Sequence, residues 1–319
     1  MRHSGIIRLV TGGRLGNQLF RYAFARALQI KHFPDYELEV GFVTRRPITE
    51  EQKRFGLKNS LVDFQIENIL AEDMLFTDKR FTSNFTFTQK LIYSFYRISR
   101  NILPKKLLPL ISSKTFRKIY NHFGIYIAQP PSRYEPFNVS WKKNILCDSE
   151  FEAHEYFDEI RDILLREFTP IHEVLPHNRE LMNDIESSQS VCVHIRRGDF
   201  MNSSNSNICT AEYFIQAMKE IHEEIPNCKF FVFSDDVELV KKTIPLPYDI
   251  TYEQGNNPSY ETLRLMYSCK HFIISNSTFS WWAQYLSRNP DKIVYAPSKW
   301  RLNDNCSGLD MPYMRRLQV

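Results

Sequence analysis

The second half of the chain alternates short apolar runs with segments whose apolar residues recur every three or four positions. Runs rich in valine, isoleucine and phenylalanine predict strands at 191–195, 229–234, 249–252, 271–275 and 292–295. The segments between them predict helices over 211–225 and 260–269, a short helix ending at Lys242, and a further helix over 278–286. Strands that alternate with helices form parallel sheets with helices on both faces. We therefore expect a doubly wound α/β sheet here.

The first half opens with a predicted strand at 5–10, followed by a glycine-containing turn and a helix with apolar residues at helical spacing. This is the layout of a phosphate-binding turn, but the turn lacks the P-loop lysine and does not match the dinucleotide pattern. One interpretation is that Gly13 lets the backbone approach a ligand, while Arg14, Asn17 and Gln18 supply hydrogen bonds. The alternative is a tight strand–helix turn in which Asn17 caps the helix.

A chain of 319 residues is long enough for two domains, each with its own core. Pro170 and Pro176 bracket a short segment between the two patterns, and we place the linker there. The expected domains are residues 1–170 and 171–319.

The most informative stretch follows the strand at 191–195, which runs directly into Arg196, Arg197, Gly198 and Asp199. Two guanidinium groups at the carboxyl end of a parallel strand lie where open α/β sheets bind ligands, and guanidinium suits bidentate contact with phosphate. We expect Asp199 to hold one arginine in place, and Gly198 suits a sharp exit turn because glycine can take a positive φ. The alternative is a strand end that carries a surface Arg–Asp pair.

Two further strand ends carry polar groups, and His194 within the first strand adds a possible contact to a polar ligand. Asp235 and Asp236 follow one strand and could accept hydrogen bonds from a ribose or a base, with helix capping by Asp235 as the alternative. Small polar residues follow another strand, where backbone N–H groups would face an anion at a helix start. These residues are Asn276, Ser277 and Thr278, with capping by Ser277 or Thr278 as the alternative.

These three strand ends would lie side by side in a parallel sheet, and together they predict a nucleotide-diphosphate pocket. No further Asp, Glu or His stands at ligand spacing beside the two aspartates, so we do not expect a metal site. Trp281 and Trp282 are expected to anchor the last helix in the core.

The segment from Lys79 to Tyr120 contains ten basic residues and no Asp or Glu, interleaved with aromatic and aliphatic residues. A basic, aromatic, amphipathic segment is typical of contact with a membrane surface. The alternative is a helical hairpin packed on the first domain with a solvated basic face.

The composition is that of a globular protein and argues against a nucleic-acid binder and a membrane-spanning protein. Hydrophobic residues make up 43% and charged residues 24%, which is usual for a globular protein. A net charge of +4 is too small to indicate a nucleic-acid binder. No apolar run reaches the length of a membrane span, and no signal-peptide pattern opens the chain, so we expect a cytoplasmic location. The six cysteines lack zinc-site spacing, and Cys192 and Cys269 are expected to be buried thiols.

Four blocks of the sequence resemble the signature blocks of the α-1,2-fucosyltransferases of glycosyltransferase family 11. They are GGRLGNQLFRYAFARAL, VCVHIRRGDF, FFVFSDD and ISNSTFSWWAQYL, which span residues 12–286 in the expected order. The resemblance implies a GT-B architecture with two Rossmann-like domains facing across a cleft. It also implies inverting transfer of L-fucose from GDP-fucose to the 2-hydroxyl of a terminal β-galactoside, with no cofactor and no divalent metal.

The resemblance assigns catalytic roles to three residues. Arg196 should contact the β-phosphate and stabilise the departing GDP, while Arg197 and Asp199 should brace the loop. Asp199 is a poor candidate for the general base, because an adjacent arginine would lower its pKa. The sequence does not identify a base.

The remaining assignments are contacts to substrate. His194 should contact the nucleoside, Ser277 and Thr278 should hold phosphate oxygens, and Asn17 and Gln18 should close the cleft from the first domain. Three alternatives stay open: a fucosyltransferase of another linkage or another GDP-sugar transferase, a nucleotide- or glycan-binding protein without turnover, and a nucleic-acid binder. The expected enzyme is a bacterial one that acts on a surface glycan, in the cytoplasm or at the inner face of the membrane.

Overall fold

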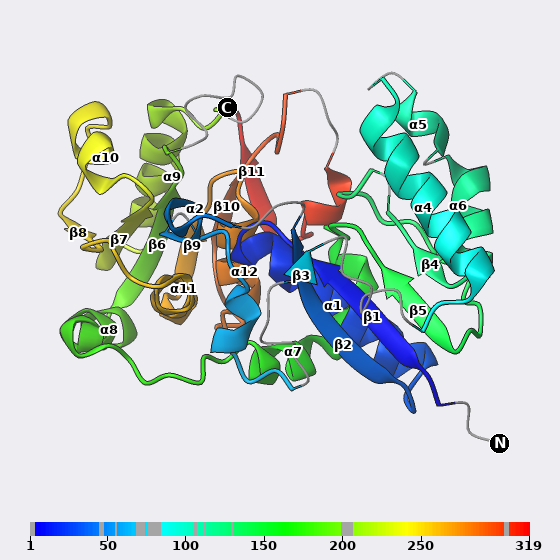
Figure 1. The fold of residues 1–319 in the computed structure, drawn as a ribbon. Helices are drawn as coiled ribbons and strands as arrows, with labels where there is room; N and C mark the ends of the chain where they lie inside the picture. Colours follow the sequence, from blue (N-terminus) through cyan, green and yellow to red (C-terminus); the bar gives the residue numbers. More distant parts are fainter. Residues whose placement is uncertain are drawn as a thin grey trace. The chain divides into compact units, whose positions relative to one another are not determined.

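The computed structural model describes residues 4–44, 48–54, 56–67, 74–75, 84–104, 107–111, 113–128, 130–198, 207–302 and 306–319. The chain divides into two compact units (Figure 1). Unit 1 contains Met1–Phe168 with the short segment Ser307–Leu309, and unit 2 contains Thr169–Cys306 with Asp310–Val319. The boundary between the units falls between Phe168 and Thr169, two residues before the expected boundary after residue 170. The sequence pattern did not predict that residues 307–309 belong to unit 1.

Unit 1 is built on a five-stranded parallel sheet with the order β3-β2-β1-β5-β4. Its strands are β1 (Ile6–Thr11), β2 (Glu37–Thr44), β3 (Met74–Leu75), β4 (Ile125–Tyr126) and β5 (Asn144–Cys147). The central strand β1 leads into α1 (Leu15–His32), which packs against it through a face of small and aromatic residues. The other helices are α2 (Glu50–Arg54), α4 (Phe87–Ile102), α5 (Leu108–Ile111), α6 (Lys114–His122) and α7 (Arg161–Glu167), with 3-10 turns η1 (Ser60–Asp63), η2 (His154–Tyr156) and η3 (Asp158–Ile160).

The turn between β1 and α1 is fixed by the buried side chain of Gln18. Its amide nitrogen donates to the carbonyl oxygens of Gly13 (2.8 Å) and Lys58 (2.7 Å), and its amide oxygen accepts from the Ser60 N–H (3.0 Å). These bonds engage both ends of an amide that has no exposed surface. We therefore assign Gln18 a structural role in place of the predicted contact with a ligand.

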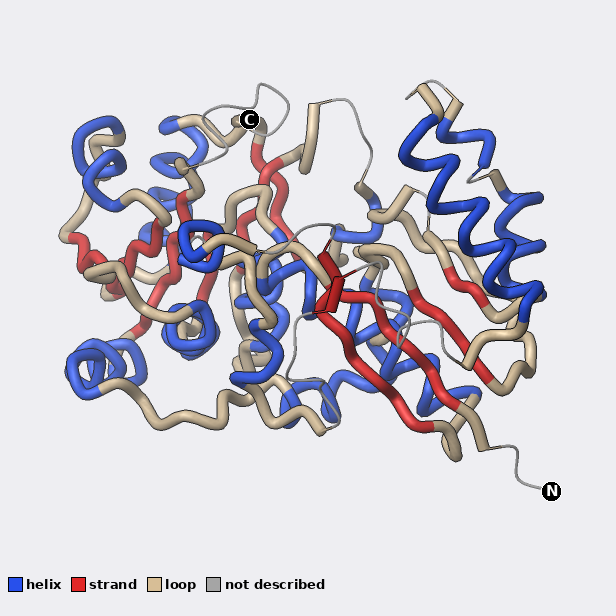
Figure 2. The backbone as a smooth tube through the Cα atoms, viewed as in Figure 1, coloured by secondary structure: helices blue, strands red, loops and turns tan. Residues whose placement is uncertain are grey.

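Unit 2 contains a six-stranded parallel sheet with the order β11-β10-β9-β6-β7-β8. Its strands are β6 (Gln189–Ile195), β7 (Cys228–Ser234), β8 (Ile250–Tyr252), β9 (His271–Ile273), β10 (Val294–Pro297) and β11 (Met314–Leu317). Its helices are α8 (Arg179–Ser187), α9 (Ala211–Glu224), α10 (Val237–Thr243), α11 (Ser259–Ser268) and α12 (Thr278–Leu286), and it has one described 3-10 turn, η4 (Pro176–Asn178). A further 3-10 turn, η6 (Ser307–Leu309), follows in the chain but belongs to unit 1. Helices lie on both sides of the strands (Figure 2), as the sequence pattern predicted.

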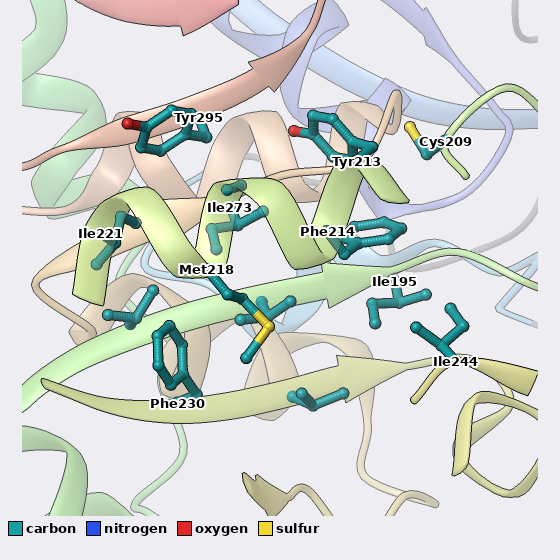
Figure 3. Close-up of a cluster of buried hydrophobic side chains, with 14 of the residues drawn as sticks. Ile195, Cys209, Tyr213, Phe214, Met218, Ile221, Phe230, Ile244, Ile273 and Tyr295 are labelled. Carbon is teal, nitrogen blue, oxygen red and sulfur yellow. The ribbon is translucent and has the colours of Figure 1, made fainter. Parts of the chain in front are cut away.

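One face of the unit 2 sheet is covered by α9. Tyr213, Phe214, Ala217, Met218 and Ile221 recur at helical spacing and are all buried. Figure 3 shows Phe214 and Met218 of this helix gathered with Ile195 and Phe230 of the strands. The amphipathic pattern of the sequence is therefore sufficient to place this helix on the sheet.

Trp281 and Trp282 are completely buried in α12, and Trp281 stacks on Tyr285 with ring centroids 4.9 Å apart. The predicted anchoring of this helix is confirmed.

Cys192 and Cys269 are buried free thiols, as expected.

The sequence analysis predicted 292–295 as the final strand of the chain, which is wrong. β11 follows it and pairs in parallel with β10, from Val294 opposite Met314 to Pro297 opposite Leu317. Its Arg315 pairs with Glu224 and its Arg316 with Asp310, so two charges at an edge position obscured the strand pattern. The short strands β3, β4 and β5 were also missed.

The basic segment contributes α4, α5 and α6, which pack on unit 1 through a core of buried side chains. Tyr93 and Tyr96 of α4, Tyr120 of α6 and the sheet residues Ile125 and Leu146 belong to this core. Behind it, the buried carboxylate of Asp148 accepts from the Tyr93 hydroxyl (2.8 Å) and from Arg97 (2.9 Å). The alternative interpretation of this segment, helices packed on the first domain, is thus confirmed as far as the packing goes. No helix among the described residues is both long and apolar enough to cross a bilayer.

Candidate functional site

The order of the unit 2 sheet places three polar strand ends next to one another. In chain order its strands run 3-2-1-4-5-6 across the sheet, with β6 between β7 and β9. The chain reverses its direction of travel at β6, and open α/β sheets bind ligands beyond the carboxyl ends of the strands at such a switch point. The prediction that the ends of these three strands lie side by side is confirmed.

Asp235 organises the loop that follows β6. Its Oδ2 lies 3.0 Å from Nη1 of Arg196, its Oδ1 accepts from the Arg197 N–H (2.8 Å), and its Oδ2 also accepts from the Gly198 N–H (2.9 Å). One carboxylate thus binds the side chain of one loop residue and the backbone of the next two. Such charge-assisted bonds are stronger than neutral ones, so the loop is held in one conformation.

The loop differs from the sequence expectations at Gly198, and Asp199 could not be tested. Gly198 does not take a positive φ. A Cβ at this position would lie too close to Asp235 Oδ2, so a larger residue would displace the carboxylate that binds the loop. Asp199, the expected brace for the arginines, lies outside the described residues. Among the described residues, Asp235 performs the bracing that the sequence assigned to Asp199.

The Arg196 side chain is half-buried, with 15% of its surface exposed, beside an Asp235 side chain that is 21% exposed. A guanidinium group retains its charge in such a place and carries five N–H donors. Arg197 also reaches toward Asn207, with Nη1 3.3 Å from Oδ1. The strand end therefore presents two cations whose positions are set by neighbouring side chains.

Asp236 caps the helix that follows β7. Its Oδ1 accepts from the Leu239 N–H (3.0 Å) at the start of α10, and its own N–H donates to Ser234 Oγ (3.0 Å). The sequence alternative named Asp235 as the cap, which is wrong, because the Asp235 carboxylate faces the arginine loop. Of the two predicted aspartates, Asp235 therefore belongs to the cluster and Asp236 to the helix start.

His194 is buried in β6 and connects two strand ends. Its Nδ1 lies 2.9 Å from Ser275 Oγ, just beyond β9, and its ring packs near Phe279 at a centroid distance of 5.9 Å. Burial lowers the pKa of His194 from 6.5 to about 4, although the negative charge of Asp235 acts in the opposite direction. The imidazole is therefore neutral at physiological pH.

The turn between β9 and α12 is built from hydroxyl and amide side chains. Ser277 is the N-cap of α12 and accepts from the Phe279 N–H (3.3 Å), as the capping alternative predicted. Asn276 donates to the Trp300 carbonyl (3.1 Å) and accepts from the Cys209 thiol (3.4 Å). Thr278 begins the helix. The turn thus positions the amino end of α12, where backbone N–H groups favour an anion, beside the end of β6.

In unit 1, Gly13 adopts φ +77°, a conformation that L side chains rarely take, and the Asn17 side chain lies beside it. Asn17 does not cap α1, since the N-cap is Arg14, whose carbonyl accepts from the N–H groups of Asn17 (3.1 Å) and Gln18 (3.2 Å). The capping alternative for Asn17 is therefore wrong. Thr11, just before this turn, has a buried hydroxyl without a hydrogen-bond partner among the described residues.

Two functional contacts escaped the sequence analysis, the Arg196–Asp235 pair and the His194–Ser275 pair. The pairing of β6 with β7 explains the Arg196–Asp235 contact. Ile195 lies opposite Ser234, so Arg196 and Asp235 are the next residues on the two strands. Among the described residues, no group of three His, Cys, Asp or Glu side chains is arranged to hold a metal ion.

Comparisons with known proteins place the chain in a family. A model of glycosyl transferase family 11 matches residues 6–307. An α-1,2-colitosyltransferase from Escherichia coli is 27% identical over 316 residues, which cover 96% of this chain and 95% of that protein. A galactoside 2-α-L-fucosyltransferase from Caenorhabditis elegans is 29% identical over 170 residues, which cover 50% of this chain and 47% of that protein.

A solved structure agrees in fold. The NodZ α-1,6-fucosyltransferase of Bradyrhizobium, co-crystallised with GDP, matches with a TM-score of 0.56 at 15% identity, over 92% of this chain and 95% of that chain. The predicted fold class, α/β with two parallel sheets of the GT-B kind, is confirmed. Because the family model spans most of the sequence, the chain belongs to glycosyl transferase family 11.

Proposed function

We propose that this glycosyltransferase moves L-fucose from GDP-fucose to the 2-hydroxyl of a terminal β-galactoside, with inversion at the anomeric carbon. The observation that carries the proposal is the Arg196 loop, fixed by Asp235 at the switch point of the unit 2 sheet. Family membership supports glycosyl transfer, and the name of the nematode relative supports the galactoside acceptor and the linkage.

In this proposal Arg196 binds the β-phosphate and stabilises the GDP leaving group. Negative charge grows on that phosphate as the bond between the sugar and the diphosphate breaks. A donor that is already oriented costs no reorganisation during the reaction, and loss of one such donor typically costs about 3–4 kcal/mol of activation free energy. The Asp235 carboxylate supplies that orientation, and Arg197 supports the same loop.

We further propose that the phosphates lie at the amino end of α12 and that no divalent metal is needed. Ser277 and Thr278 stand at this helix start, next to the strand that carries the arginines. The helix end and the Arg196 guanidinium provide the kind of positive charge that a metal ion supplies in other transferases. Asn276 holds the turn through Trp300.

His194 is proposed to orient the nucleoside side of the pocket as a neutral group. It is a poor general base, because its ring is buried, its Nδ1 already faces Ser275 and its pKa is far below that of an exposed histidine. Asp235 is also a poor base, because its oxygens are occupied by a cation and two N–H groups.

The turn of unit 1 is proposed to serve the acceptor. Gly13 holds this turn in a left-handed conformation, and Asn17 and Arg14 flank it. Gln18 contributes indirectly, since it fixes the shape of this turn from within the protein.

A second candidate donor is the GDP derivative of colitose. The bacterial relative that matches along nearly its full length is named an α-1,2-colitosyltransferase. Colitose is fucose without the 3-hydroxyl, so the two donors differ by a single polar group. A site that hydrogen-bonds this hydroxyl would discriminate strongly against colitose, whereas an apolar site would discriminate weakly.

The proposed reaction is tested by incubating the protein with GDP-fucose and terminal β-galactosides in the presence of EDTA, with the linkage of the product read by NMR. We expect an α-1,2-linked fucose and no loss of rate on chelation. GDP-colitose run in parallel gives the donor ratio. A product of another linkage, or a rate restored only by added metal, would contradict the corresponding part of the proposal.

Replacement of Arg196 by alanine tests the phosphate role. We expect kcat to fall by roughly 10²–10³-fold with the fold retained, because a transition-state contact is lost while the buried core is untouched. Arg196→Lys should recover only part of the rate, since lysine lacks the planar fork. Arg179→Ala, at a largely exposed arginine, is the matched control and should retain its rate. An Arg196→Ala enzyme with most of its kcat would refute the assignment.

The pH dependence of stability tests the burial of His194. Its folded pKa of about 4 lies below the unfolded value of 6.5, so the unfolded state binds the proton more readily. The stability supplied by this group is therefore complete above pH 6.5 and decreases as the pH falls toward 4, by roughly 3 kcal/mol in total. Urea unfolding between these limits should show this slope in the wild type and a shallower one in His194→Gln. His122→Gln, at an exposed histidine, is the control; an unchanged slope in His194→Gln would contradict the burial argument.

A further inference from the structure

Helix α4 carries apolar residues on two faces, of which the core of unit 1 covers only one. Tyr93 and Tyr96 are buried in that core. The other face forms a stripe of large apolar side chains at successive spacings of four, four, three and four residues, which we call the α4 stripe. Its members and their exposed fractions are Phe87 (82%), Leu91 (60%), Phe95 (48%), Ile98 (56%) and Ile102 (75%).

The helices that follow α4 carry further exposed apolar side chains. These are Leu107 just before α5, Leu110 in α5 and Ile119 in α6. Single exposed apolar residues are common, but a continuous stripe over four helical turns marks an interaction surface. Figure 1 shows α4, α5 and α6 grouped together in unit 1.

Within the segment that contains the α4 stripe, the charged residues are of one sign. The sequence has no Asp or Glu from Lys79 to Arg133. Lys90, Lys114 and Lys118 are exposed and form no ion pair with another described residue. The inward-facing arginines of the same segment are neutralised within the protein, Arg97 by Asp148 and Arg117 by Glu135. The exposed side chains of α4 and α6 therefore include both large apolar residues and lysines that form no ion pair with another described residue.

We propose that the α4–α6 hairpin binds an anionic membrane surface, with α4 lying in the plane of the interface. The α4 stripe would enter the boundary between headgroups and acyl chains, and the lysines would remain among the anionic headgroups. Aromatic and long aliphatic residues combined with lysine on one helical surface are typical of this binding mode. The inference is independent of the proposed reaction.

Charge argues against a second copy of the chain as the occupant of this face. Two copies joined through the α4 stripe would bring together two basic segments that contain no Asp or Glu, and like charges across an interface oppose association. A lipid surface that is rich in phosphate groups satisfies both the apolar and the basic side chains.

The test is flotation of the full chain with vesicles of phosphatidylcholine alone or with about one third phosphatidylglycerol. We expect binding to the anionic vesicles, with a partition coefficient at least about tenfold above that for the neutral ones. Leu91→Glu/Ile98→Glu should reduce this coefficient by about tenfold or more, because two carboxylates would then enter the interface. Lys90→Glu/Lys114→Glu/Lys118→Glu should remove the preference for anionic lipid.

Matched controls separate the hairpin from general surface effects. Val62→Glu/Ile171→Glu adds two charges at exposed apolar positions elsewhere, and Lys143→Glu/Lys219→Glu/Lys242→Glu makes the same charge change on other exposed lysines. Both should bind vesicles like the wild type. Far-UV circular dichroism and thermal unfolding of each variant establish that it is folded.

Three results would overturn the proposal. The first is no binding of the wild type to anionic vesicles. The second is equal loss of binding in the matched controls and the hairpin variants. The third is a wild-type dimer in sedimentation equilibrium that Leu91→Glu/Ile98→Glu converts to monomer, since the α4 stripe would then be covered by a second copy.

Discussion

The candidate site depends on one carboxylate. Asp235 follows β7, yet it binds the Arg196 guanidinium and the backbone N–H groups of Arg197 and Gly198, which follow β6. A loop with two adjacent arginines would otherwise be dispersed by the repulsion of like charges and by the entropy of long side chains. The carboxylate offsets both effects, and Gly198 leaves room for it, because a Cβ there would displace the carboxylate. A rigid cation at the switch point of a parallel sheet is the physical basis of the proposed diphosphate site.

Several of the polar residues predicted to bind substrate use their hydrogen bonds inside the protein. Gln18 and Asp236 are committed, the first to three bonds inside unit 1 and the second to the start of α10. His194 is a neutral link between β6 and the residue after β9. This matters for mechanism, because a group whose bonds are satisfied inside the protein can orient a reacting group but cannot easily accept a proton from one.

Much of this arrangement could be predicted from the sequence, since the order of strands and helices in unit 2 follows from hydrophobic periodicity. The three polar strand ends together, with the stretch from Val191 to Asp199 as the most informative, pointed to the candidate site. What the sequence could not supply was the pairing across strands: the brace was expected next to the arginines in the chain, but among the described residues it comes from the neighbouring strand. β11 was hidden by Arg315 and Arg316, and the two apolar faces of α4 could not be divided into inner and outer without knowing what covers them.

Calorimetric titration of GDP into the wild type and Asp235→Asn tests the central claim most directly. If Asp235 organises the arginine loop, this variant should bind GDP about tenfold more weakly or worse, even though a negative charge near the phosphates has been removed. Glu238→Gln removes a nearby exposed carboxylate on α10 and should leave the affinity unchanged. If Asp235→Asn binds GDP as tightly as the wild type, or more tightly, then Asp235 only repels the anion and the account of the site is wrong.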